Sequence, residues 1–171
     1  MTEIIREARP EDYEPIVKLL NQVQELHEQW RPDIYKFNRS FFNQSIFEEE
    51  MQNNAIYVAQ TEAGVKGVME ITYRHIESPV HVTRDVVFVD SMVVDREYRG
   101  KGIGHLFFDK LKEIKEAKKL DGIELQVNAR NTMAYEMYKK YGFTEKSINM
   151  ELNKIAARWP AKAVAQFSFS Q

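Results

Sequence analysis

The stretch from Val93 to Gly104 is the part of this sequence that most constrains what the chain can fold into. An apolar run typical of a strand gives way to a glycine-rich loop with Arg99 and Lys101, and apolar residues then recur at helical spacing from Ile103. Glycine lets a backbone approach a bound group closely, and the first turn of a helix offers unpaired N–H groups and a partial positive charge. The stretch therefore predicts an anion-binding bend between a strand and a helix, with phosphate or pyrophosphate as the anion.

The spacing of the glycines excludes two common phosphate-binding loops. The P-loop requires Gly-Lys followed by Ser or Thr, whereas Gly102 follows Lys101 here. The dinucleotide pattern G-x-G-x-x-G lacks its third glycine, and Phe107 stands there when the pattern is read from Gly102. The pattern that remains is R-x-x-G-x-G, beginning at Arg99, whose basic residues either add charge to the anion site or are simply solvated.

A second pattern lies downstream, where Asn131 and Ala134 are followed by Tyr138 and then by Gly142-Phe143. Together the two patterns resemble the hallmarks of the GNAT N-acetyltransferase superfamily. The first is similar to its acetyl-CoA signature, Q/R-x-x-G-x-G/A, and the second to its Asn, helical Tyr and Gly-Phe. The resemblance extends from about residue 2 to residue 154, and its specific motifs cover residues 90–143.

Composition narrows the class of protein. A chain of 171 residues is long enough for one domain with a sizeable core, and a formal net charge of −2 argues against a nucleic-acid partner. The absence of cysteine excludes disulfides, thiolate nucleophiles and zinc–thiolate sites. The first residues are too polar for a signal peptide, and no apolar run is long enough to cross a bilayer. We therefore expect a cytoplasmic protein with no membrane partner.

Periodicity predicts elements in the order β-α-α-β-β-β-α-β-α-β-β. This is the order of the GNAT fold, an α/β (α+β) architecture in which helices flank both faces of a mixed central sheet. Strands are expected at Ile4–Ala8, Ile56–Ala59, Val65–Arg74, Asp85–Val94, Ile123–Val127, Phe143–Lys146 and Ile148–Leu152, and helices from Glu11 to the break at Arg31, at Ser40–Met51, from Ile103 to Gly122 and at Thr132–Tyr141.

The chain is expected to comprise a GNAT domain at residues 1–154 and a C-terminal extension at residues 155–171. Aromatic residues in the extension, such as Trp159 and Phe167, predict either docking on the domain or on a second subunit, or disorder. Because dimers are common in the superfamily, the resemblance also implies a possible homodimer.

The resemblance implies acetyl-CoA as co-substrate. Backbone amides of the glycine-rich bend would hold the pyrophosphate, and the pantetheine arm would lie along the preceding strand. Asn131 either contacts the coenzyme or serves only the start of its helix. The implied binding residues are Met92, Val93, Val94, Arg99, Gly100, Lys101, Gly102, Ile103, Gly104 and Asn131.

Two residues occupy the catalytic positions of the family. Tyr138 matches the tyrosine that protonates the leaving thiolate, although helical spacing also fits a core aromatic residue. Asp90 interrupts an apolar strand, where burial of a carboxylate is costly. It is a candidate for deprotonating the amine through a water, for orienting a cationic substrate, or for accepting a local backbone N–H.

These residues predict transfer of an acetyl group from acetyl-CoA to a primary amine by direct attack. The acceptor is a small molecule or a peptide, and His27, Trp30 and Tyr35 are candidates for contacting it. The histidine spacing does not suggest a metal site. The alternative is a catalytically weak acyl-CoA-binding sensor or interaction module with the same fold.

Overall fold

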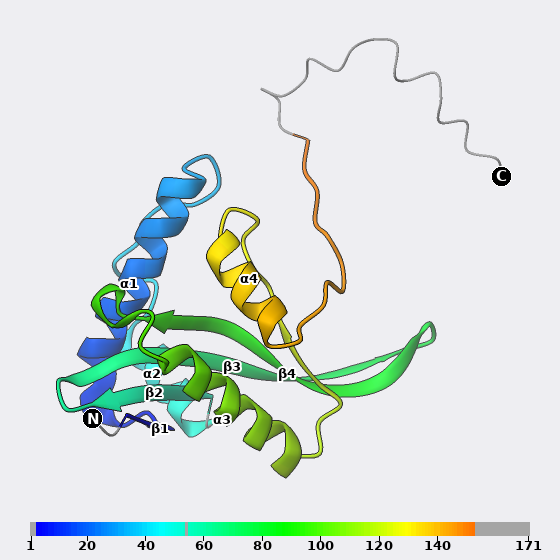
Figure 1. The fold of residues 1–171 in the computed structure, drawn as a ribbon, viewed down its shortest axis with the longest axis horizontal. Helices are drawn as coiled ribbons and strands as arrows, with labels where there is room; N and C mark the ends of the chain where they lie inside the picture. Colours follow the sequence, from blue (N-terminus) through cyan, green and yellow to red (C-terminus); the bar gives the residue numbers. More distant parts are fainter. Residues whose placement is uncertain (1–2, 54, 153–171) are drawn as a thin grey trace, which may run out of the picture. The chain divides into compact units, whose positions relative to one another are not determined.

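The computed structural model describes residues 3–53 and 55–152. Its contacts divide the chain into two compact units, residues 1–130 and 131–171, and each unit is considered by itself. The elements are β1 (Ile4–Glu7), α1 (Tyr13–Trp30), α2 (Gln44–Gln52), β2 (Ile56–Thr61), β3 (Gly64–Ser78), β4 (His81–Val94), α3 (Ile103–Ala117), β5 (Gly122–Leu125) and α4 (Thr132–Lys140), as drawn in Figure 1.

The first unit is built on a mixed sheet with strand order β1-β2-β3-β4-β5. Neighbouring strands are antiparallel from β1 to β4, and β5 is parallel to β4. The β3–β4 hairpin is the longest feature of the sheet and extends beyond β1 and β2 (Figure 1). A parallel final strand requires a crossover, and α3 supplies it.

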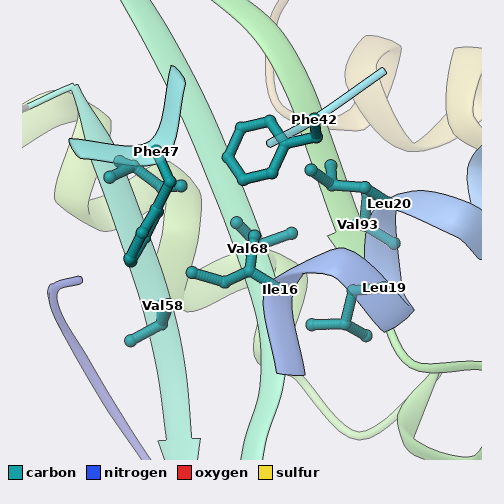
Figure 2. Close-up of a cluster of buried hydrophobic side chains, with 9 residues drawn as sticks. Ile16, Leu19, Leu20, Phe42, Phe47, Val58, Val68 and Val93 are labelled. Atoms are coloured by element: carbon teal, nitrogen blue, oxygen red, sulfur yellow. The ribbon is translucent and has the colours of Figure 1, made fainter. Parts of the chain in front are cut away.

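One face of the sheet is covered by α1 and α2. Ile16, Leu19 and Leu20 recur at helical spacing along α1 and are buried against Val68 and other apolar residues of the strands. Figure 2 shows this cluster, in which Phe42 and Phe47, from the segment around α2, lie together with side chains of α1 and of the strands. Its members are Ile16, Leu19, Leu20, Phe42, Phe47, Ile56, Val58, Val68 and Val93.

The other face is covered by α3, whose residues Ile103, Phe107 and Leu111 are almost fully buried. The helix approaches the sheet at Gly67 of β3. A Cβ atom at Gly67 would lie 2.9 Å from Phe107 Cε2, and 3.2 Å from the Cβ atom of Ala59. The lack of a side chain at Gly67 is therefore what allows the helix to pack this closely.

Most of the predicted elements are confirmed, but several boundaries differ, among them those of two helices. The second helix begins at Gln44 rather than Ser40, because Asn43 caps it by accepting hydrogen bonds from the amides of Ser45 and Ile46. The third helix ends at Ala117, because Lys119 adopts a left-handed backbone conformation (φ 55°), and Gly122 is already in β5.

The predicted final strand pair is also wrong within the described residues. Residues 143–152 form no strand there, and the alternating apolar side chains of Ile148, Met150 and Leu152 are exposed. Alternation alone does not make a strand, because an extended segment also needs a hydrogen-bonded neighbour. The predicted extension at residues 155–171 lies outside the described residues.

Within the part of the chain that the structure describes, no helix has the length and apolarity needed to span a bilayer.

Candidate active site

The glycine-rich bend forms an open turn at the N-terminus of α3. Gly100 and Gly102 have positive φ angles of 75° and 94°, and a Cβ atom at either position would meet nothing within 4 Å. Gly102 is the N-cap residue, and no side chain caps the helix. The first amides of α3 therefore retain donor capacity beside open space, which is the geometry that an anion requires. The bend fits the diphosphate of a coenzyme in this respect.

Basic side chains surround the bend. Arg99 Nε donates a 3.1 Å hydrogen bond to the carbonyl oxygen of Val94, which folds the side chain back onto the end of β4. Two ammonium groups lie over the ring of Tyr98, with Lys101 Nζ 4.3 Å and Lys66 Nζ 4.8 Å from its centroid. These contacts hold positive charge next to the uncapped helix terminus.

The strand that leads into the bend changes partners along its length. β5 pairs with β4 only along Val86–Val89, and no described strand pairs with that edge of β4 beyond Val89. The antiparallel ladder with β3 continues to Val94 on the other edge. Backbone groups on the free edge near Met92 can therefore bind an extended ligand by strand-like hydrogen bonds, while the side chain of Val93 belongs to the core.

A β-bulge marks the point where β4 and β5 separate. Glu70 pairs with Ser91 and Ile71 pairs with Val89, which leaves Asp90 as an extra residue in β4. Although its strand is otherwise apolar, the side chain of Asp90 is 39% exposed and avoids the cost of burying a carboxylate. Thr72 Oγ1 donates a 2.6 Å hydrogen bond to its Oδ2 atom, and Arg74 lies 3.5 Å from Oδ1.

A cavity of about 700 Å³ lies beside the bulge. The residues around α2 form one wall, and β3 and β4 form the other. Apolar rings and carboxyl groups therefore face the same space. The lining residues are Phe41, Phe42, Ile46, Glu49, Glu50, Asn53, Ala55, Glu70, Ile71, Thr72, Tyr73 and Asp90.

Two acidic residues of this cavity, Glu50 and Glu70, were missed by the sequence analysis. Burial, with the nearby charge of Asp90, raises the pKa of Glu50 to about 7. Burial and the charge of Glu50 raise the pKa of Glu70 to about 8. The available signal was Glu70 within an otherwise apolar run of β3, Val68-Met69-Glu70-Ile71, which has the same form as the interruption by Asp90 in β4.

The second unit contains the predicted acid and its helix. The Asn131 side chain caps α4 by accepting a 3.2 Å hydrogen bond from the amide of Ala134. Gly142, with φ 91°, ends the helix, as predicted, and the rings of Tyr138 and Phe143 are 5.9 Å apart edge to face. Burial raises the pKa of the Tyr138 hydroxyl, so it stays protonated at neutral pH.

The three residues predicted to contact the acceptor form an aromatic cluster at the end of α1. The His27 ring lies 5.7 Å from that of Trp30 and 5.0 Å from that of Tyr35. Burial lowers the pKa of His27, so its ring is mainly neutral at pH 7. None of the three lines the cavity beside Asp90. Among the described residues, no group of His, Cys, Asp or Glu side chains is arranged to hold a metal ion.

The geometry thus joins an uncapped, glycine-lined helix terminus to a strand whose edge becomes free at a bulge. The sequence profile of the family described as "Acetyltransferase (GNAT) domain" matches residues 21–157, which is most of the chain. The chain belongs to the GNAT acetyltransferase family. The predicted superfamily and fold class are thereby confirmed.

Solved structures share the fold of this GNAT chain. A mutant of the BH1408 protein from Bacillus halodurans is 32% identical, with a TM-score of 0.80 over 88% of this chain and 98% of that one. An aminoglycoside N-acetyltransferase, AAC(6')-Iy, solved in complex with CoA, is 16% identical, with a TM-score of 0.68 over 90% and 95% of the two chains. At that identity the likeness concerns the fold alone.

A curated relative of this GNAT chain is the streptothricin acetyltransferase of Escherichia coli. It is 32% identical over 66 residues, which are 39% of this chain and 38% of the relative. The aligned part spans about a third of the length of the curated relatives that the chain matches.

Proposed function

We propose that this GNAT chain is an N-acetyltransferase that transfers the acetyl group of acetyl-CoA to a primary amine by direct attack. The observation that carries the proposal is the open, uncapped N-terminus of α3 at Gly102, which directly follows the strand whose free edge begins at Asp90. A diphosphate bound at the N-terminus of α3 and a pantetheine arm along the free edge of β4 would direct a thioester toward the bulge. The four residue steps of strand from Val94 to Asp90 span roughly 13 Å.

The proposed residues divide into three groups by role. The backbone from Arg99 to Gly104 binds the diphosphate, with charge from Arg99 and Lys101, and the backbone of Met92, Val93 and Val94 binds the pantetheine arm. Asn131 caps α4, and we propose that it also contacts the coenzyme.

The chemistry requires a neutral amine and a protonated leaving group. Tyr138 is proposed to donate a proton to the sulfur, and its raised pKa supports this role because the hydroxyl remains a donor near pH 7. Asp90 is proposed to orient the amine at the mouth of the cavity, a role supported by its exposed carboxylate. His27, Trp30 and Tyr35 remain proposed contacts for the outer part of the acceptor.

We propose further that the acceptor is a small molecule or a peptide bearing an amine, that the protein acts in the cytoplasm, and that it forms a homodimer. The streptothricin acetyltransferase among its relatives supports a small-molecule acceptor.

Two assays test the proposed function together. Isothermal titration with CoA is expected to show stoichiometric binding, and a panel of primary amines supplied with acetyl-CoA is expected to include at least one that releases free CoA. Binding without release across the panel would instead support the acyl-CoA-binding sensor. If the protein neither binds CoA nor releases it from acetyl-CoA, both functions are refuted.

A further inference from the structure

The cavity beside the bulge carries two carboxyl groups from opposite walls. Glu50 is on α2, and Glu70 is on β3, directly across the ladder from Ser91. A hydrogen bond from Ser91 and the charge of Glu50 both act on the Glu70 carboxyl. Glu70 thus lies next to the residue that follows the bulge, where the free edge of β4 begins, and Glu50 faces Glu70.

One carboxylate oxygen of this pair lacks a hydrogen-bond donor among the described residues. Glu50 Oε2 is enclosed by the protein, and no amide, hydroxyl or cationic nitrogen among the described residues donates a hydrogen bond to it. A buried carboxylate oxygen without a donor is costly. A proton shared with the neighbouring Glu70 carboxyl, or a cation bound in the cavity, would stabilise this oxygen.

The surrounding charges do not supply that cation. The acidic groups that act on the pair are Asp90 from β4 and Glu49 from α2. Arg74 of β3 is engaged by Asp90 and stacks over the ring of Phe88, with its guanidinium carbon 3.3 Å from the centroid. The lining of the cavity therefore combines a surplus of acidic groups with apolar rings at Phe41 and Phe42.

We propose that Glu50 and Glu70 form a proton-sharing pair that binds the protonated acceptor amine and takes its proton, the apolar part of the amine lying against Phe41 and Phe42. This inference rests on the proposed acetyl transfer and names the residues that deprotonate the substrate. Asp90 then orients the substrate and does not act as the base, a distinction that the sequence left open.

The proposed step balances in atoms and charge. An N–H bond of the ammonium breaks and an O–H bond forms on the carboxylate of the pair, which leaves a neutral amine with a free lone pair. That lone pair forms the C–N bond to the thioester carbonyl carbon as the C–S bond breaks. The nitrogen loses one further proton, which matches the proton that the thiolate gains, and the carboxyl proton passes to water.

Binding of two probes tests the pair without reference to turnover. In the presence of CoA at pH 7.5, we expect 2-phenylethylamine to bind the full-length protein at least about tenfold more tightly than 2-phenylethanol, its neutral isostere. Glu50→Gln and Glu70→Gln should each remove most of this preference. Glu48→Gln, which alters an exposed carboxylate on the same helix outside the cavity, should retain it.

Two results from the binding assay would overturn the proposal. One is equal binding of amine and alcohol by the wild type, or no amine binding at all. The other is a preference that survives both glutamine substitutions. If Glu70→Gln does not fold, as judged by circular dichroism, Glu50→Gln decides the outcome, because either substitution breaks the pair.

The pH profile of the reaction distinguishes the group that acts as the base from the residue that orients the substrate. With an amine that the wild type acetylates, kcat/KM should increase with pH through the neutral range as the pair loses its proton; this increase is the rising limb of the profile. Glu70→Gln should lower kcat/KM by about 100-fold or more and flatten the rising limb. Asp90→Asn should raise KM and leave the limb in place. If Asp90→Asn alone removes the limb, the base is Asp90 and the pair proposal fails, whereas the proposed acetyl transfer stands.

Discussion

The hydroxyl of Thr72 lies 2.6 Å from Oδ2 of Asp90 and donates a hydrogen bond to it across the β3–β4 ladder. This bond fixes the extra residue of the bulge, because Asp90 has no opposite partner in the ladder. The orientation of the carboxylate is therefore set by a neighbouring strand and by Arg74 at 3.5 Å.

Thr72→Val should disturb that orientation without changing the shape of the side chain. We expect a two- to tenfold loss of kcat/KM, mainly through KM, which corresponds to about 0.5–1.5 kcal/mol for one hydrogen bond. Steady-state kinetics with an accepted amine measure this. Thr83→Val, on an exposed residue of β4, is the control, and equal effects in both variants would show that the bond has no special role.

Tyr138→Phe removes a single hydroxyl from the proposed acid. Turnover should decrease by about 100-fold if protonation of the thiolate limits the rate, while the affinity for acetyl-CoA stays within a factor of two. Stopped-flow measurement of the chemical step and isothermal titration separate the two effects. An unchanged chemical step would remove Tyr138 from the mechanism.

Gly102→Ala tests the bend through two independent consequences. The position has φ 94°, so any side chain there introduces strain of about 1–2 kcal/mol, and a methyl group would occupy the open space beside the first amides of α3. We expect a lower Tm and at least tenfold weaker binding of CoA.

Gly64→Ala is the control for this variant. Gly64 also has φ 94° and open space around its Cβ position, but it lies in the β2–β3 turn. It should show the same loss of stability and normal CoA affinity. Equal CoA affinity in the two variants would mean that the bend does not bind the coenzyme.

Gly67→Ala should destabilise the first unit by overpacking. The added Cβ atom would lie 2.9 Å from Phe107 Cε2, so either α3 or the ring has to move. The expected cost is about 1–3 kcal/mol, measured as a lower midpoint in urea unfolding with an unchanged m value. A midpoint equal to that of the wild type would show that the helix accommodates the methyl group freely.

Glu70→Gln should flatten the dependence of stability on pH. The folded-state pKa of Glu70 is raised to about 8 from a usual value of 4.5, so between those values the folded state holds a proton that the unfolded state releases. Stability is therefore greatest below about pH 4.5 with respect to this group, and is lost as pH rises toward 8.

Urea unfolding at pH 6 and pH 8 measures this difference. The wild type should lose more stability between the two values than Glu70→Gln, which has no carboxyl to ionise there. A wild-type curve that rises from pH 6 to pH 8, with no change on substitution, would contradict the buried carboxyl.

Local patterns predicted most of the fold, and tertiary contacts explain the failures. The apolar spacing along α1 and the apolar runs of β2 and β3 are local, and these elements were predicted. The run Ile148-Asn149-Met150-Glu151-Leu152 has the alternation of a strand, yet forms none, because strand formation depends on a partner that the pattern does not specify.

The same contrast between local patterns and tertiary contacts applies to the candidate site. The glycines of the bend were predicted because their spacing is a local pattern, and the positive φ angles at Gly100 and Gly102 agree with it. The Glu50–Glu70 pair was missed because its members are 20 positions apart in the printed sequence and meet only when α2 packs on the sheet. A buried acid in a strand is visible in sequence, but its partner is not.

The bulge has a consequence for insertions and deletions. Removing one residue from the middle of a strand normally turns every later side chain to the opposite face. Deletion of position 90 would have the opposite effect. Val89 and Ser91 already oppose the adjacent residues Ile71 and Glu70, so the shortened strand would pair in regular register with residues 67–76 and keep Val93 in the core. The chain is therefore expected to fold without its ninetieth residue, which the ladder between β3 and β4 does not require.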